Sequence, residues 1–230
     1  LVQDPQLLPG TDDDYPLAQQ TVMLRLSRRF GEGSGIGRLA RDVNAADADA
    51  AQATLEALSR QAGSDTRHID LEREGAKALE TLVLEGDPTH REDPSGSAPI
   101  GQGYGHYLDV LRRERPSAAT GPDDPAWTDW ASAVLAAFDA FRLLCAVRKG
   151  DYGVERLNAR IESALTARGW IDARQAWYEG RPVLVTRNDY GLGLMNGDVG
   201  IALMLPEAPT LNGATREARL RVAFPRNDGS

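Results

Sequence analysis

A change of hydrophobic periodicity near Trp177 is the feature that most constrains the fold of this chain. Before it, segments with helical apolar spacing alternate with short strand-like runs, which favours a layered α/β domain. After it, three short segments with strand character, RPVLVTRND, DVGIALML and ARLRVAF, are separated by turn-rich sequence. They predict a small β-barrel or β-meander. We therefore expect two regions, residues 1–176 and residues 177–230.

The first region is expected to be rich in helices. Ser34 and Asp124 are placed to cap two of them. Two runs predict strands: TVMLRLSRRF alternates apolar and polar residues, and RLLCAVRKG is a short apolar run that ends in charge and glycine. Cys145 is expected to be a packed residue of the second, buried strand. The segments with helical spacing are residues 34–44, 47–60, 73–86, 103–113, 125–141 and 152–169.

Composition narrows the classes of function. The formal net charge of −8 argues against a free-standing nucleic-acid-binding module, which usually presents a basic face. Basic residues nevertheless gather between Arg25 and Arg41, so any contact with a polyanion must be local. The first residues have no signal-peptide pattern, and no apolar run approaches the roughly 20 residues that span a membrane. A single cysteine fits a reducing compartment, so we expect a cytoplasmic protein without a membrane contact.

Complete catalytic motifs are absent from the sequence. It contains no GxxxxGK[ST] phosphate loop, no HExxH, no CxxC and no GxSxG. His68, His90 and His106 lie in separate segments without a neighbouring ligand cluster, so we expect no metal site.

Arg28 and Arg29 end the first predicted strand and face a glycine-rich turn, FGEGSGIG. A guanidinium there is well placed to reach a phosphate, because it stays charged and offers fixed, forked donors. It could stabilise charge on a transferred γ-phosphoryl group. Two adjacent arginines after a strand are also common as surface residues that form ion pairs.

Four segments resemble the RecD family of superfamily 1 DNA helicases, in the family's order. Arg28 stands where the family usually has tyrosine, and Arg29 falls on the family's arginine. The resemblance spans about residues 20–205. The segments are LRLSRRF with SGIGRLARDVN, GYGHYLDVLR, FRLLCAVRKGDYGVERLNARIE, and WYEGRPVLVTRNDYGLGLMNGDVGIAL.

The resemblance implies an α/β fold, namely part of the second RecA-like motor domain with a small SH3-like β-barrel insertion at the C-terminal end. It implies that Arg29 is the catalytic residue that reaches the γ-phosphate, with Arg28 beside it at the nucleotide. ATP and Mg²⁺ would be bound by the full-length protein, and neither by this fragment alone.

The same resemblance implies a 5′–3′ helicase on single-stranded DNA that acts in double-strand break repair and recombination. Its partners would be the beta and gamma subunits of exodeoxyribonuclease V, of which beta carries the nuclease site. The phosphate loop and the other ATP-binding motifs would lie outside this sequence, so the fragment is not expected to hydrolyse ATP.

The candidate DNA-binding residues are Arg187, Asn188, Asn196 and Arg148, the last with its neighbour Lys149. They would contact phosphate or sugar, because a helicase must tolerate every base. The alternative is that the RND and NGD clusters form stabilising turns, with Arg187 paired to Asp189 or Asp198.

Two further questions stay open at this point. Tyr104 and Tyr107 could stack on bases, although packing in a core or a subunit interface fits their helical face better. The whole chain could instead be a non-catalytic subunit-interaction module. It could also belong to another superfamily 1 helicase, such as a conjugative relaxase-helicase.

Overall fold

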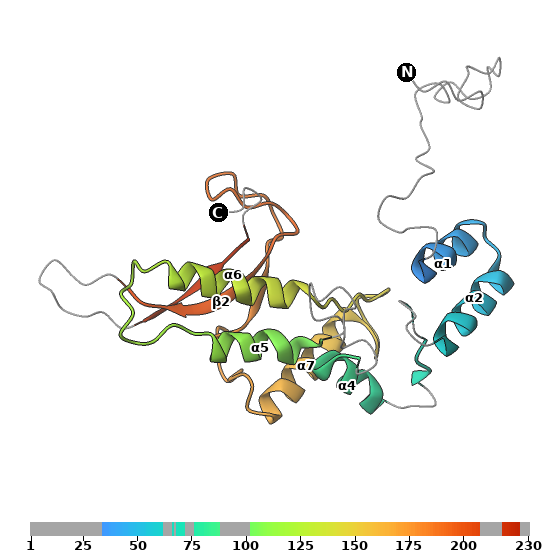
Figure 1. The fold of residues 1–230 in the computed structure, drawn as a ribbon, viewed down its shortest axis with the longest axis horizontal. Helices are drawn as coiled ribbons and strands as arrows, with labels where there is room; N and C mark the ends of the chain where they lie inside the picture. Colours follow the sequence, from blue (N-terminus) through green and yellow to red (C-terminus); the bar gives the residue numbers. More distant parts are fainter. Residues whose placement is uncertain are drawn as a thin grey trace, which may run out of the picture. The chain divides into compact units, whose positions relative to one another are not determined.

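A computed structural model describes residues 34–61, 66, 68–71, 76–87, 102–207 and 218–225 (Figure 1). The chain divides into two compact units, residues 1–69 and residues 70–230, and each unit is described by itself. The predicted strand TVMLRLSRRF, with Arg28 and Arg29, lies outside the described residues.

The first unit contains a pair of helices, α1 (Gly35–Asn44) and α2 (Ala48–Arg60). The Ser34 hydroxyl accepts a hydrogen bond from the Gly37 N–H at 3.3 Å, so the predicted cap is confirmed. The two helices are joined by the Thr54 hydroxyl, which donates to the Asp42 carboxylate at 2.7 Å.

The second unit has four helices in its described part, and all four were predicted. The predicted cap of α6 at Asp124 is wrong, because Pro125 occupies the N-cap position; the Asp124 carboxylate instead accepts a hydrogen bond from the Ala126 N–H at 2.9 Å just before the helix. The helices are α4 (Ala76–Glu85), α5 (Tyr104–Arg113), α6 (Ala126–Asp139) and α7 (Val154–Ala167).

Three antiparallel strands follow in the order β1-β2-β3, so the predicted β-meander is confirmed. They are β1 (Pro182–Leu184), β2 (Val199–Leu205) and β3 (Arg219–Ala223). Leu184 pairs with Val199, and Ile201 pairs with Ala223. The result is a mixed fold of helices and a small sheet. The boundary at residues 176 and 177 stays a prediction.

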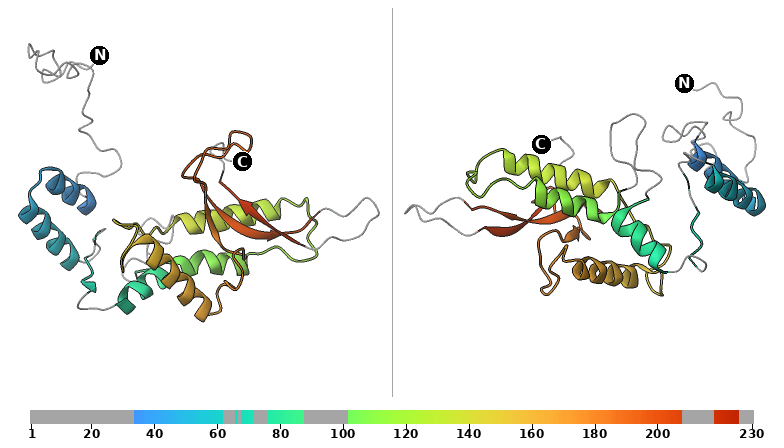
Figure 2. Two further views of the ribbon diagram at one scale, coloured as in Figure 1. Left: turned by 180° about the vertical axis from the view of Figure 1, so that it is seen from behind. Right: turned by 60° about the horizontal axis from the view of Figure 1, so that its bottom comes forward.

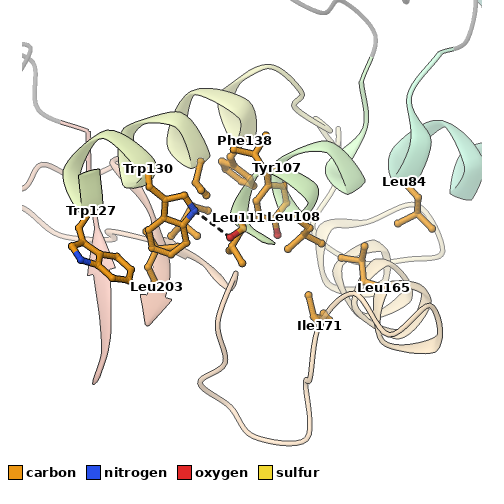
Figure 3. Packing of buried hydrophobic residues seen from close by; sticks show 13 residues of the cluster. Leu84, Tyr107, Leu108, Leu111, Trp127, Trp130, Phe138, Leu165, Ile171 and Leu203 are labelled. Atoms are coloured by element: carbon orange, nitrogen blue, oxygen red, sulfur yellow. Dashed lines mark hydrogen bonds between the residues drawn. The ribbon is translucent and has the colours of Figure 1, made fainter. Parts of the chain in front are cut away.

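One hydrophobic core joins the sheet to the helices (Figure 3). Ile201 and Leu203 of the central strand are completely buried. One face of α6 packs on them, and its four large residues Trp127, Trp130, Val134 and Phe138 are all buried in the same cluster. Figure 2 shows α5 and α6 lying side by side along the sheet. The sheet is therefore packed on helices along its central strand.

The segment from Tyr178 to Arg181 connects this sheet to α5. The Gly180 N–H donates to the Ala202 carbonyl at 2.7 Å, and the Tyr107 hydroxyl donates to the Gly180 carbonyl at 2.9 Å. Both bonds lie at the edge of the core, where an unpaired polar group is costly. Gly180 is thus held from both sides.

Arg115 and Glu179 form a second connection between the end of α5 and the sheet. Arg115 donates to both Glu179 carboxylate oxygens, at 3.0 and 2.9 Å, and to the Met204 carbonyl at 2.9 Å. Glu179 in turn accepts from the Met204 N–H at 2.8 Å. Such forked, charge-assisted bonds fix geometry as well as adding stability.

The buried strand predicted over RLLCAVRKG is wrong. Residues 142–150 have no regular secondary structure, the Leu144 residue is 88% exposed, and Cys145 is only half-buried. Within the described part of the chain no strand pairs with this segment. Val154 lies in the first turn of α7 beside this open segment and is 39% exposed.

Tyr107→Phe is expected to lower the free energy of unfolding by about 1–3 kcal/mol, because it leaves the buried Gly180 carbonyl without a donor. Urea denaturation followed by circular dichroism measures this. The control is Tyr152→Phe, a residue that is 48% exposed, where a change within about 0.5 kcal/mol is expected. Equal, small effects of the two substitutions would contradict a structural role for the Tyr107 hydroxyl.

Candidate nucleic-acid interface

The strongest candidate site is the hairpin that joins β1 to β2, residues 185–198. At its base, the Val185 N–H donates to the Asp198 carbonyl and the Gly197 N–H donates to the Val185 carbonyl, both at 2.9 Å. Further out, Asp189 and Leu194 exchange two backbone hydrogen bonds of 2.7 and 2.9 Å. The hairpin is therefore ordered along its length and ends in the four-residue turn 190–193.

The polar side chains of the RND and NGD clusters support this hairpin from within. Asp189 accepts from the Leu192 N–H at 3.1 Å, and Asp198 accepts from the Met195 N–H at 2.7 Å. The Asn188 side chain accepts from the Asn196 N–H at 2.7 Å and donates to the Tyr190 hydroxyl at 3.1 Å. The stabilising-turn interpretation is confirmed for the carboxylates and for Asn188.

The side chains of the hairpin that face solvent include one positively charged group and several large apolar groups. Arg187 is exposed and, within the described residues, forms no ion pair, so the predicted pairing with Asp189 or Asp198 is wrong. Tyr190 is 78% exposed and Leu192 is 71% exposed. A hydrogen-bonded hairpin with an exposed guanidinium and an exposed aromatic ring can contact a phosphate and stack on a base.

The predicted DNA-binding residues fall into two places. Arg187, Asn188 and Asn196 lie together on the hairpin, whereas Arg148 and Lys149 lie in the link between α6 and α7. The amide of Asn188 is used inside the hairpin, where it orients Tyr190. DNA contact by each of these residues stays a prediction.

The link that carries Arg148 is bonded onto the start of α7. The Val154 N–H donates to the Val147 carbonyl at 3.1 Å, and the Glu155 N–H donates to the Arg148 carbonyl at 3.2 Å. These first-turn donors, which could otherwise bind an anion, are already occupied. Gly150 has a φ of +93°, and a Cβ at Gly153 would lie 2.6 Å from the Lys149 backbone. This explains the two glycines of RKGDYG.

The two tyrosines of α5 are core residues, as the packing interpretation predicted. Tyr107 is 2% exposed, and Tyr104 stacks on Phe138 with ring centroids 5.7 Å apart. Burial raises the pKa of both phenols above the usual value. Neither ring is placed to stack on a base.

Sequence reasoning missed Tyr190 and its apolar neighbours Leu192 and Met195. A signal was present, because large apolar residues inside a glycine-rich turn are hard to bury.

Within the described residues, no helix is long and apolar enough to cross a bilayer.

The chain is similar to curated proteins over most of its length, although no protein-family model matches it. It is 32% identical over 215 residues to the RecBCD enzyme subunit RecD of Mycolicibacterium smegmatis, covering 90% of this chain and 32% of that protein. It is 36% identical over 194 residues to RecBCD enzyme subunit RecD of Mycobacterium tuberculosis, covering 84% and 26%. For the same subunit of Haemophilus influenzae the values are 28% over 198 residues, 84% and 28%. The chain thus spans between a quarter and a third of these relatives.

Gly153→Ala is expected to cost about 1–3 kcal/mol of stability, because its Cβ would overlap the Lys149 backbone and the link could not close on α7. The midpoint of urea denaturation measures this loss of stability, provided that the slope of the unfolding free energy against urea concentration is unchanged. The matched control is Gly121→Ala, where a Cβ would meet nothing within 4 Å. A Gly153 variant as stable as the Gly121 variant would contradict the tight link.

Proposed function

The chain belongs to the RecD family, and from this we propose that it is part of the second motor domain of an ATP-dependent 5′–3′ DNA helicase subunit. The observation that carries the proposal is the match to RecD subunits over 84–90% of the chain. In this proposal the described helices belong to a RecA-like domain, and the β-meander belongs to an SH3-like region. The helicase would act within a helicase–nuclease in DNA repair and recombination.

Arg29 is the proposed sensor of nucleotide, with Arg28 beside it. In the complete protein, ATP and Mg²⁺ would be held by a first motor domain that carries the phosphate loop. Arg29 would reach the γ-phosphate when the two domains close, and its fixed positive charge would stabilise the charge that develops during phosphoryl transfer. This chain has no phosphate loop of its own. It would therefore not hydrolyse ATP alone.

The hairpin 185–198 is the proposed contact with single-stranded DNA. Arg187 supplies an unpaired positive charge for a phosphate, and Tyr190 supplies an exposed ring on which any base can stack. Neither contact reads sequence, as a translocating motor requires. Domain closure on ATP would move this contact along the strand.

The proposed partners are the beta and gamma subunits of exodeoxyribonuclease V. A second candidate function, a subunit-interaction module, is favoured by the apolar side chains around the hairpin. Leu184 is 59% exposed and Met195 is 48% exposed. Such residues are enriched at protein interfaces when they lie together.

Arg29→Ala in a full-length RecD subunit that contains this segment is expected to lower DNA-stimulated ATP turnover about 10³-fold or more, because removing an arginine that contacts the transferred phosphoryl group has an effect of that size. Steady-state ATPase assays measure it. Nucleotide binding and the far-ultraviolet circular dichroism spectrum should be unchanged.

The control for that assay is Arg60→Ala, which removes an exposed arginine that pairs with Glu56 within α2. Turnover by the Arg29 variant within a few-fold of the Arg60 variant would reject Arg29 as the sensor. Arg28→Ala, made in parallel, then shows which arginine acts.

Tyr190→Ala in the same full-length protein is expected to weaken binding to oligo-dT about 5- to 150-fold, through the loss of one base-stacking contact. Arg187→Gln is expected to reduce the slope of log K against log salt by about 0.7, through the loss of one phosphate contact. Fluorescence anisotropy over a salt series measures both.

Arg174→Gln is the matched control for Arg187, because Arg174 is an exposed arginine that pairs with Asp172. If Arg187→Gln and Tyr190→Ala bind DNA as the control does, the hairpin is not the DNA contact. If these two hairpin variants instead lose binding to the beta or gamma subunit while their DNA affinity is unchanged, the result supports the interaction module.

A further inference from the structure

A cavity of about 270 Å³ lies between α5, α6, α7 and the start of β1, and the proposed function leaves it without a role. We call it the helix–strand cavity; Tyr107, Phe138, Glu162 and Arg181 border it. The side that α7 contributes comes from residues 158, 161, 162 and 165, which share one face of the helix. Pockets that bury a drug-sized ligand measure roughly 300–1,000 Å³, so this cavity suits a smaller group.

The floor of the helix–strand cavity is apolar. Tyr107, Phe138 and Leu165, which are labelled in Figure 3, are all buried. The rings of Tyr107 and Phe138 meet edge-to-face, with centroids 5.1 Å apart. These rings pack on each other, so they give the cavity an apolar surface against which a flat group can lie.

Hydrogen bonds hold the walls of the cavity apart. The Tyr107 hydroxyl donates to the Gly180 carbonyl at 2.9 Å, and the Tyr178 hydroxyl donates to the Glu162 carboxylate at 3.1 Å. Each bond runs from a helix to the segment 178–181. The cavity is therefore formed before any ligand arrives, as small-molecule sites usually are.

The rim of the cavity is polar, and its charges balance. Glu162 and Arg181 lie 3.6 Å apart, and among the described residues they are the only charged side chains that line the cavity. The guanidinium of Arg181 is held over the Tyr178 ring, 5.4 Å from its centroid. A neutral rim above an apolar floor favours an uncharged occupant, because a charge withdrawn from water must be paired.

Two groups at the rim have hydrogen-bonding capacity left. Tyr178 and Arg181 both approach Oε2 of Glu162, and no hydrogen bond within the described ranges reaches Oε1. Asn158, one helical turn earlier, is exposed, and its amide forms no hydrogen bond to another described residue. A carboxylate oxygen accepts, and an amide both donates and accepts. The rim therefore matches a group with donors and acceptors along one edge.

We propose that the helix–strand cavity binds a single nucleobase. A base is flat and uncharged and carries donors and acceptors on its edge, so it matches the floor, the neutral rim and the size of the cavity. A hydrocarbon side chain of a partner would match the floor alone. Because the rim both donates and accepts, it accommodates more than one kind of base.

The base has two chemical sources, a free nucleoside or nucleotide and a single strand of DNA. Pro182 lines the cavity, and Arg187 of the hairpin follows five residues later, at most about 17 Å along an extended strand. A strand held by the hairpin can therefore also reach the cavity. Only this second source rests on the proposed function.

Saturation-transfer NMR of this chain with thymidine tests the free source. Transfer to the base protons is expected to saturate on the order of 1 mM, because one ring system makes few contacts. Asn158→Trp, which puts an indole across the rim, is expected to reduce the transfer at least about 5-fold. The matched control is Ser163→Trp, at an exposed residue of α7 that does not line the cavity, and it should behave as wild type. Far-ultraviolet circular dichroism checks that both variants are folded.

Fluorescence anisotropy of oligo-dT with a full-length RecD subunit that contains this segment tests the strand as source. Asn158→Trp is expected to weaken binding about 5- to 150-fold relative to Ser163→Trp, through the loss of one base contact. The two variants should bind an abasic strand of the same length equally.

The outcomes separate this proposal from that of the hairpin. If Tyr190→Ala binds oligo-dT as wild type does while Asn158→Trp does not, the hairpin proposal fails and the cavity stands. Thymidine transfer that Asn158→Trp reduces, with equal binding of oligo-dT by the two α7 variants, assigns the cavity to a free base. Thymidine transfer that Asn158→Trp leaves unchanged overturns the proposal. So does the absence of transfer together with equal binding of oligo-dT by the two variants, or with a difference between them that persists on the abasic strand.

Discussion

The larger unit depends on the hydrogen bonds that hold the segment 178–181 between α5 and the sheet. Gly180 bonds to Ala202 of the central strand with its N–H and to the Tyr107 hydroxyl with its carbonyl. Glu179 adds a bond to the Met204 N–H and a forked pair with Arg115. These groups are wholly or partly withdrawn from water, so breaking one leaves its partner unsatisfied. The sheet therefore has a fixed position on the helices.

The other side of the segment is held by α7. The Tyr178 hydroxyl donates to the Glu162 carboxylate at 3.1 Å, and Arg181 lies 3.6 Å from the same carboxylate. Burial, with the nearby Glu162 charge, raises the pKa of Tyr178 to about 12. The phenol thus stays protonated and keeps donating at neutral pH. Since β1 begins directly after this segment, the hairpin 185–198 projects from a base that is anchored on α5, α7 and β2.

This anchoring matters for the proposed contact with DNA. The hairpin is anchored at its base, and the Tyr190 hydroxyl accepts a hydrogen bond from Asn188, so less entropy is lost when this ring binds. Its carboxylates are turned to its own backbone N–H groups. The acidic net charge of the chain therefore does not preclude a local contact with a polyanion. The link at residues 141–147 differs, because Phe141 packs on Tyr104 whereas Leu144 is exposed.

The sequence by itself determined the local elements. Hydrophobic period and caps predicted α1, α2, α4, α5, α6 and α7 and the three strands, because these signals depend on neighbours only a few residues away. Short sequence motifs likewise carried the resemblance to RecD. Only the tertiary structure decided which residues are free to act. Asn188 and Asn196 are joined to each other, and Tyr190 is exposed. Among the residues that the structure describes, Arg187 forms no ion pair and RLLCAV pairs with no strand. Pairing, burial and exposure depend on contacts between segments that are distant in the chain, and a one-dimensional pattern does not contain them.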